Sequence, residues 1–184
     1  MTTFGPVFDA GWYLTITTFA RETPWLHGIF VAVTEYGVVL LAVAVAAILW
    51  RERRGEPRKA IWIPVAMVLA YLVNSGIKDW VVEARPCRAI QHVVTVLPCD
   101  GPTDYSFPSN HTVVFAAFTG AVFLLKRAWG VFALVATLVM GFSRVYVGAH
   151  YPHDVLGGLA VGLLIGLAGH LVLTVMKQRQ ATAT

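Results

Sequence analysis

Residues 155–176 read VLGGLAVGLLIGLAGHLVLTVM and contain no Asp, Glu, Lys or Arg. A helix that crosses a bilayer needs about 20 mostly apolar residues, and this stretch alone is long enough. Four further runs that lack charge precede it, at 37–50, 60–77, 113–125 and 129–142. Some of them reach the length of a span only with their semi-polar flanks. The pattern predicts a polytopic helical membrane protein.

The overall composition supports the same class. Of the 184 residues, 57% are hydrophobic and 13% are charged, and the mean hydropathy is +0.67. A soluble domain of this length needs a more polar surface than such a composition supplies. We therefore expect a single all-α domain over residues 1–184, a membrane helical bundle with about five transmembrane helices.

The polar segments between the runs indicate where the helices begin and end. Residues 6–20 lean apolar but are broken by Asp9, so we expect an N-terminal helix at the outer interface. Whether residues 6–36 hold an additional span stays open. The expected spans run from Trp25 or Tyr36 to Trp50, from Ala60 to Trp80, from Ser109 to just before Lys126, from Trp129 to Tyr146 and from Asp154 to Met176.

The formal net charge of +4 is distributed unevenly between the two sides of the bundle. One side carries nine basic against two acidic residues, and the other carries five basic against eight acidic residues. Basic connections favour the cytoplasm, so the charge reports topology, and we expect no nucleic-acid partner. The nine basic residues are Arg51, Arg53, Arg54, Arg58, Lys59, Lys126, Arg127, Lys177 and Arg179.

Polar residues collect at the opposite, extracytoplasmic face in three clusters. In the first, Lys78 and Arg85 are seven residues apart, about two helical turns, so both side chains can point to one side. The second, SFPSNHT at 106–112, lies where a loop becomes a helix, and the free N–H groups of a helix start bind anions. Both clusters suit a phosphate group.

The third cluster joins the last two spans. Ser143 and Arg144 are followed by His150, and Asp154 comes four residues later. A carboxylate beside an imidazole holds one tautomer of the ring and stabilises its charged form. This arrangement is typical of a histidine that takes part in catalysis.

Together the three clusters resemble the signature of the type 2 phosphatidic acid phosphatase superfamily. They read Lys-x6-Arg-Pro at 78–86, Pro-Ser-x-His at 108–111 and Ser-Arg-x5-His-x3-Asp at 143–154, and all ten fixed positions match. The resemblance spans about residues 24–170. Asn110 stands where the commonest form of the family has glycine, and this variant is more similar to the undecaprenyl diphosphate phosphatase branch.

The resemblance implies a role for each matching residue. His150 would attack phosphorus and form a phosphohistidine, His111 would serve as general acid and then base, and Asp154 would orient His150. No metal-binding carboxylate cluster is evident in the sequence, so we expect neither a metal nor another cofactor. The residues expected to bind the substrate phosphate are Lys78, Arg85, Ser109, Asn110 and Arg144.

The substrate expected from the resemblance is an undecaprenyl-type isoprenoid diphosphate, hydrolysed to the monophosphate and inorganic phosphate. Phosphatidic acid or phosphatidylglycerol phosphate is the alternative at the same site. A distant alternative is a transporter that binds phosphate without cleaving it; it would carry polar residues through its spans, whereas here they collect at one face. The oligomeric state stays open.

Four further features lie outside the fixed positions of the signature. Cys87 and Cys99 share the extracytoplasmic loop and are either a disulfide or two free thiols. Glu35 is either functional or a helix cap at the interface. His153 is expected to be a loop histidine without a catalytic role. Gly158, Gly162 and Gly166 recur every fourth residue and favour close helix packing, within the monomer rather than across a dimer.

Overall fold

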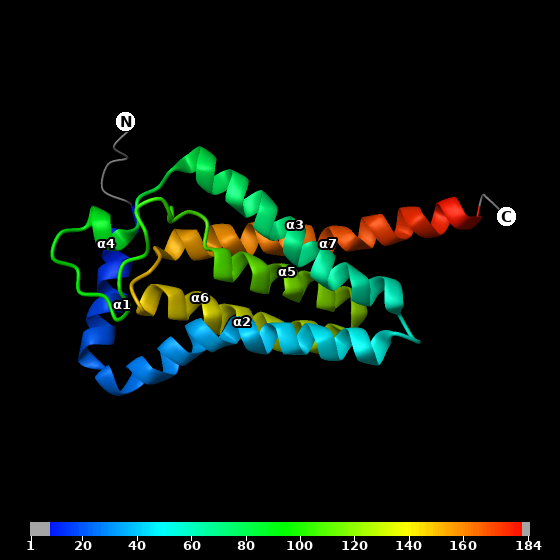
Figure 1. Ribbon diagram of the computed structural model, residues 1–184, viewed down its shortest axis with the longest axis horizontal. Helices are drawn as coiled ribbons and strands as arrows, with labels where there is room; N and C mark the ends of the chain where they lie inside the picture. The colour runs from blue at the N-terminus through cyan, green and yellow to red at the C-terminus, as the bar shows by residue number, and fades with distance from the viewer. Residues whose placement is uncertain (1–7, 182–184) are drawn as a thin grey trace.

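The helices form one elongated bundle (Figure 1). The computed structural model describes residues 8–181, and within them the chain is helical apart from its connections and one long loop. The helices are α1 (Ala10–Glu22), α2 (Pro24–Glu52), α3 (Pro57–Val81), α4 (Pro86–Ala89), α5 (Asn110–Leu125), α6 (Arg127–Tyr146) and α7 (Pro152–Ala181). The predicted all-α membrane bundle is confirmed.

Helix α5 occupies the centre and packs against α3, α6 and α7. Four helices of the described chain, α2, α3, α6 and α7, are long and apolar enough to cross a membrane. With 16 residues α5 is about 24 Å long, shorter than the roughly 30 Å hydrocarbon core. These four helices and the shorter apolar α5 together agree with the expected bundle of about five transmembrane helices. The central helix can be short because protein surrounds it.

The glycines of α7 form its contact with α5. A Cβ on Gly162 would lie 2.3 Å from the carbonyl oxygen of Val113, and one on Gly166 would lie 2.4 Å from that of Ala117. Only a residue without a side chain allows the two backbones to approach this closely. The prediction that the glycine face packs within the monomer is confirmed.

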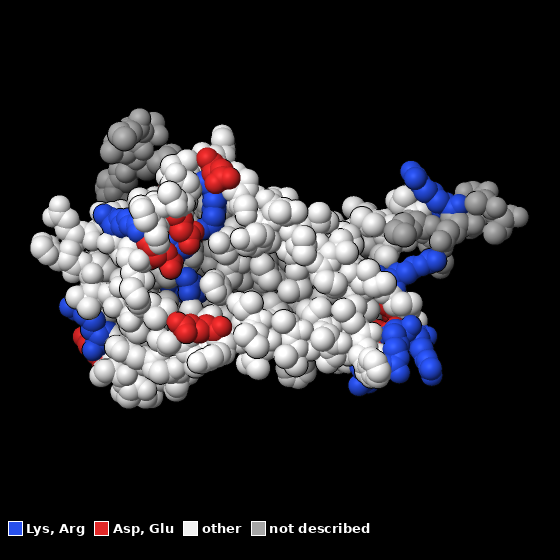
Figure 2. Space-filling view, viewed as in Figure 1, with Lys and Arg blue, Asp and Glu red and all other residues white. Residues whose placement is uncertain are grey.

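The middle of the bundle exposes apolar side chains, as expected of a surface in contact with lipid. Leu40 on α2 is 68% exposed, Phe132 on α6 is 75% exposed and Leu164 on α7 is 71% exposed. In Figure 2 this middle zone is white, whereas charged side chains lie at the two ends. Lys and Arg dominate the end at the right of that view, and both signs of charge meet at the other end.

The N-terminal segment holds a short helix rather than an additional span. Helix α1 has 13 residues and ends before Pro24, where α2 begins. The Tyr13 hydroxyl donates to the carbonyl oxygen of Gly148 at 3.1 Å, while Trp12 is 71% exposed. One face of α1 thus packs on the loop after α6. Residues 6 and 7 of the expected helix lie outside the described residues.

Candidate active site

A cavity of about 280 Å³ lies at the end of the bundle that carries the long loop. Parts of all three sequence clusters reach it, although they come from three different helices and their connections. This convergence is what the sequence predicts for a single catalytic site. The cavity is lined by Thr34, Glu35, Arg85, Leu97, Asp100, Asp104, Asn110, His111, Arg144 and His150.

His150 lies in the loop between α6 and α7, with its side chain only 1% exposed. Its Nδ1 is 3.1 Å from Oδ2 of Asp154. A carboxylate only accepts hydrogen bonds, so Nδ1 carries the proton and donates it. Nε2 then keeps its lone pair, and it lies 3.4 Å from Nη1 of Arg85. The nitrogen that keeps its lone pair therefore faces the cationic cavity.

The surroundings keep this imidazole neutral. Burial lowers the pKa of His150 well below its usual value, and the charges of Arg144 and Arg85 lower it further. A protonated imidazole has no lone pair to offer an electrophile. The low pKa thus favours the form that a nucleophile requires.

Asp154 is fully buried, and one of its two carboxylate oxygens accepts three hydrogen bonds. Oδ2 accepts the backbone N–H of Tyr151 at 2.8 Å, the Nδ1–H of His150 and the hydroxyl of Ser106. These donors hold the carboxylate in place behind His150. Ser106 belongs to the second cluster, but no sequence pattern indicated that its hydroxyl holds Asp154.

The three cations of the signature are buried, Arg85 and Arg144 line the cavity, and two acidic loop residues already form ion pairs with the three cations. Arg85 forms ion pairs of 2.8 Å with Asp100 through Nη1 and with Asp104 through Nη2. Lys78 lies 3.2 Å from Asp104. Arg144 is more loosely paired, 3.9 Å from Asp100. The two carboxylates lie against the cations that are expected to bind a substrate phosphate.

The loop that carries these carboxylates is tied back to α4. The structure pairs Cys87 with Cys99 in a disulfide, which resolves the two readings of these cysteines. Asp100 directly follows the second cysteine. Burial acts to raise the pKa of Asp104, but the charges of Arg85 and Lys78 outweigh it and lower the pKa below its usual value. The loop therefore presents an anion to the cavity over the whole neutral range.

The start of α5 contributes to the site through two adjacent residues in different ways. Asn110 lines the cavity, and its Oδ1 accepts a 2.7 Å hydrogen bond from Nδ2 of Asn74. Ser109 is fully buried, and Thr112 donates to its hydroxyl at 3.1 Å. The structure thus brings Asn110 to the cavity wall and Ser109 just behind it. Asn74, which sequence reasoning missed, is a buried amide within a predicted span, and that was the available signal.

Two further residues complete the cavity wall. His111 lies on the first turn of α5, one residue beyond Asn110. Glu35 lies on α2 and is exposed, yet it also lines the cavity. This position favours the functional reading of Glu35 over that of a helix cap, since it lies well inside α2.

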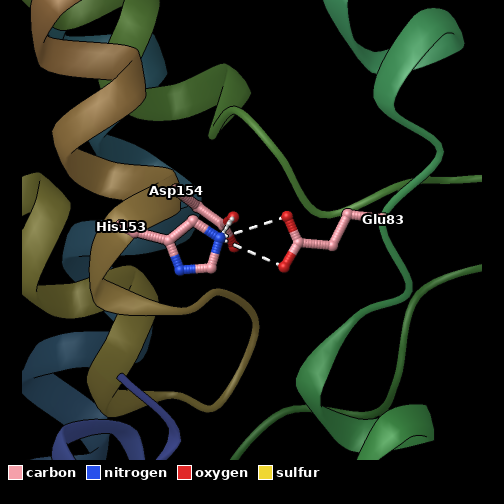
Figure 3. Close-up of side chains that lie close together, drawn as sticks. All are labelled: Glu83, His153 and Asp154. Atoms are coloured by element: carbon pink, nitrogen blue, oxygen red, sulfur yellow. Dashed lines mark hydrogen bonds and ion pairs between the residues drawn. The ribbon is translucent and has the colours of Figure 1, made fainter. Parts of the chain in front are cut away.

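The expectation that His153 lies in a loop is wrong. It lies in the first turn of α7, and its ring contacts the carboxylates of Asp9 and Glu83. Figure 3 shows Glu83, His153 and Asp154 facing one another. One donor atom from each of these three lies within 4.8 Å of the others. The sequence showed no such cluster because Glu83 is far from 153–154 along the chain.

Known proteins share both the sequence pattern and the fold. Residues 59–179 match the model of the PAP2 superfamily. The undecaprenyl-diphosphatase BcrC of Bacillus subtilis (strain 168) is 36% identical over 143 residues, 77% of this chain and 72% of that protein. Phosphatidylglycerophosphatase B of the same organism is 29% identical over 161 residues, 77% of this chain and 72% of that protein.

A solved structure has the same architecture. The crystal structure of LpxE from Aquifex aeolicus superposes with a TM-score of 0.75 over 92% of this chain and 98% of that one, at 20% sequence identity. At this identity the likeness concerns the fold. The match of the family model, the related sequences and the convergence of the three clusters agree with one another, so the chain belongs to the PAP2 superfamily and is a membrane-spanning hydrolase of lipid phosphates.

Proposed function

We propose that the chain hydrolyses an undecaprenyl-type isoprenoid diphosphate to the monophosphate and inorganic phosphate, through a phosphohistidine at His150. One observation carries the mechanism: the unprotonated Nε2 of His150 lies 3.4 Å from Arg85, at a cavity that Arg144 also lines. The name of the relative at 36% identity and the Asn110 variant of the second cluster support the isoprenoid substrate.

The first step forms the phosphohistidine. The terminal phosphate replaces the carboxylates of Asp100 and Asp104 among the cations, where Arg side chains can hold two phosphate oxygens at once. Nε2 of His150 attacks phosphorus, and the bond from phosphorus to the bridging oxygen breaks. His111 donates a proton to that oxygen as the lipid monophosphate leaves. The cations stabilise the charge on the equatorial oxygens in the transition state.

The second step releases inorganic phosphate. His111, now neutral, accepts a proton from a water molecule, and the resulting hydroxide attacks the phosphorus of the phosphohistidine. The P–N bond breaks, phosphate leaves and His150 regains its lone pair. Asp154 holds the ring through Nδ1 in both steps and stabilises its positive charge, without bonding to phosphorus.

The active site would face the extracytoplasmic side. Arg51, Arg53 and Arg54, at the far end of α2, give the opposite end of the bundle its positive charge, which favours the cytoplasm (Figure 2). The disulfide in the long loop agrees with an oxidising compartment.

A single reporter cysteine tests this orientation. It would replace Val94, an exposed loop residue, in a variant with Ser at Cys87 and Cys99. We expect an impermeant maleimide to label it from outside intact cells. Labelling only after the cells are opened would reverse the orientation.

The substrate is tested by phosphate release from purified protein in detergent with a chelator present. Undecaprenyl diphosphate, phosphatidic acid and phosphatidylglycerol phosphate would be compared, with His150→Ala as the inactive variant and His92→Asn as the control. Loss of the nucleophile should lower kcat by about 10³-fold or more. Preference for a glycerolipid would refute the isoprenoid substrate, whereas full activity of His150→Ala would refute the mechanism.

A glycerolipid phosphate is the second candidate substrate. The relative named phosphatidylglycerophosphatase B favours it, at 29% identity over 77% of this chain. The same three cations and His150 would serve either headgroup, because both present a terminal phosphate. The two candidates therefore differ in the lipid that binds beside the cavity, and the substrate comparison separates them.

A further inference from the structure

A second polar cluster lies next to the catalytic carboxylate and has no part in the mechanism above. His153 is its centre. Nδ1 of His153 lies 3.0 Å from Oδ1 of Asp9, and its backbone N–H donates to Oδ2 of the same residue at 2.8 Å. Nε2 points the other way and lies 3.1 Å from the carboxylate of Glu83. Its ring is stacked on the rings of Phe107 and Tyr151, which fix its plane.

The free oxygen of Asp154 completes this cluster. Oδ2 serves His150, but Oδ1 is buried and accepts no hydrogen bond from any residue that the structure describes. It lies 3.4 Å from Nε2 of His153 (Figure 3). A buried carboxylate oxygen without a donor costs free energy, so native proteins rarely leave one. The ion-pair partner of Oδ1 is the ring of His153, so a positive charge at Nε2, whether a proton or a metal ion, serves this oxygen.

The charges around His153 point to a cation with more than one charge. Asp9, Glu83 and Asp154 surround a single imidazole, and the side chains of Asp9 and Asp154 are 5% and 0% exposed. A proton on Nε2 would leave this group with two net negative charges. Buried charge that is not compensated is strongly unfavourable. A divalent ion in place of that proton compensates more of it.

We propose that Glu83, His153 and Asp154 bind one Zn²⁺ ion. Donor atoms around a tetrahedral zinc with bonds of about 2.0–2.1 Å lie about 3.3 Å apart. Nε2 of His153 lies 3.1 Å from Oε1 of Glu83 and 3.4 Å from Oδ1 of Asp154, so two of the three donor distances have this spacing, and all three donors lie within 4.8 Å of one another.

The rest of the coordination shell also suits zinc. Asp9 accepts from Nδ1 of His153, as carboxylates do behind histidines that bind zinc. An imidazole ligand favours zinc over Mg²⁺ or Ca²⁺, which prefer oxygen ligands. Glu83 and His153 are 16% and 15% exposed, so an ion and a water as fourth ligand have access from the outside.

The ion would act on turnover through Asp154, a consequence that rests on the proposed mechanism. Zinc on Oδ1 draws negative charge away from Oδ2, the atom that supports His150. The positive ring that forms when phosphorus is attacked is then less well stabilised. Bound zinc therefore slows the enzyme and is a negative regulator, while the chelated enzyme stays active.

Direct binding tests the site without any need for turnover. Purified wild type, Glu83→Gln and the exposed-loop control His92→Asn would be equilibrated with Zn²⁺ against a chromophoric chelator. Asparagine suits position 92, where φ is 61°. We expect one saturable zinc in wild type and in His92→Asn, and at least tenfold weaker binding in Glu83→Gln. The absorption of Co²⁺ in the same site should disappear in Glu83→Gln.

Two binding results would overturn the site. One is the absence of a saturable zinc in wild type, and the other is equal affinity in wild type and Glu83→Gln. Thermal unfolding with chelator present checks that Glu83→Gln is folded, since glutamine keeps the shape of glutamate. A failure of the proposed histidine mechanism would leave both binding results unchanged.

Turnover in the presence of zinc tests the regulation. We expect zinc to lower kcat of wild type and of His92→Asn and to affect Glu83→Gln only at a concentration at least tenfold higher. Equal inhibition of all three proteins would place the inhibitory zinc elsewhere, for example at His111 in the catalytic cavity, and would overturn the regulatory role.

Discussion

His150 and His153 are three residues apart and lie on the two sides of one carboxylate, yet their surroundings are opposite. His150 faces Arg85 and lies at a cavity that Arg144 lines, so its ring is kept neutral. His153 faces the carboxylates of Asp9 and Glu83 and contacts no cationic side chain among the described residues. Residue type alone therefore does not determine what a histidine does. The charges that tertiary packing brings to each ring distinguish the proposed nucleophile from the proposed cation ligand.

The largest effect on catalysis should follow from a change at Asp154, which contacts both histidines. Asp154→Asn keeps the shape of the side chain but lets an amide N–H face Nδ1 of His150, which favours the wrong tautomer. We expect kcat to fall by about 10²- to 10⁴-fold, since the equivalent change in a serine protease triad costs about 10⁴-fold. Initial rates of phosphate release measure it. The exposed Asp79→Asn is the matched control and should keep its kcat.

A smaller effect concerns the contribution of His150 to the stability of the fold at acidic pH. Because its pKa is lowered in the native state, the unfolded chain binds a proton that the native chain does not as pH falls below about 6.5. Acid therefore destabilises the fold, by up to about 1.4 kcal/mol per pH unit. Thermal unfolding in detergent at pH 7, 6 and 5 should show that Tm falls more steeply with decreasing pH for wild type than for His150→Gln. Parallel curves would mean that the pKa of His150 is the same in the folded and the unfolded protein.

The smallest effect concerns the loop carboxylates that form ion pairs with the cations of the site. Asp104→Asn removes an anion that competes with the substrate phosphate for Lys78 and Arg85. Asp104 is 44% exposed, so water screens its ion pairs with the two cations. Removal of its charge should therefore lower KM only about two- to fivefold and leave kcat nearly unchanged. Steady-state kinetics at low and high salt measure this. A higher KM would mean that Asp104 positions the cations rather than competing for them.

Most of the fold and the composition of the site could be predicted from the sequence. The length of apolar runs such as 155–176 predicts helices that cross a bilayer. The seven-residue spacing predicted Lys78 and Arg85 on one side of a helix, but α3 ends at Val81 and Arg85 lies in the connection before α4, so this part of the prediction is wrong. The surroundings of the short central α5 could not be predicted, because an apolar run has the same composition whether lipid or protein surrounds it. Only the packing of α5 against three neighbours shows why 16 residues suffice.

The sequence alone determined the class of protein, the difference in charge between the two ends of the bundle and the residues of the signature. These features depend on composition and on spacing along the chain. Tertiary structure decided which charges meet. Asp100 and Asp104 reach Arg85 through the fold of the long loop, and Asp9 reaches His153 across 144 positions. Such contacts follow from how helices pack, and no local pattern encodes them.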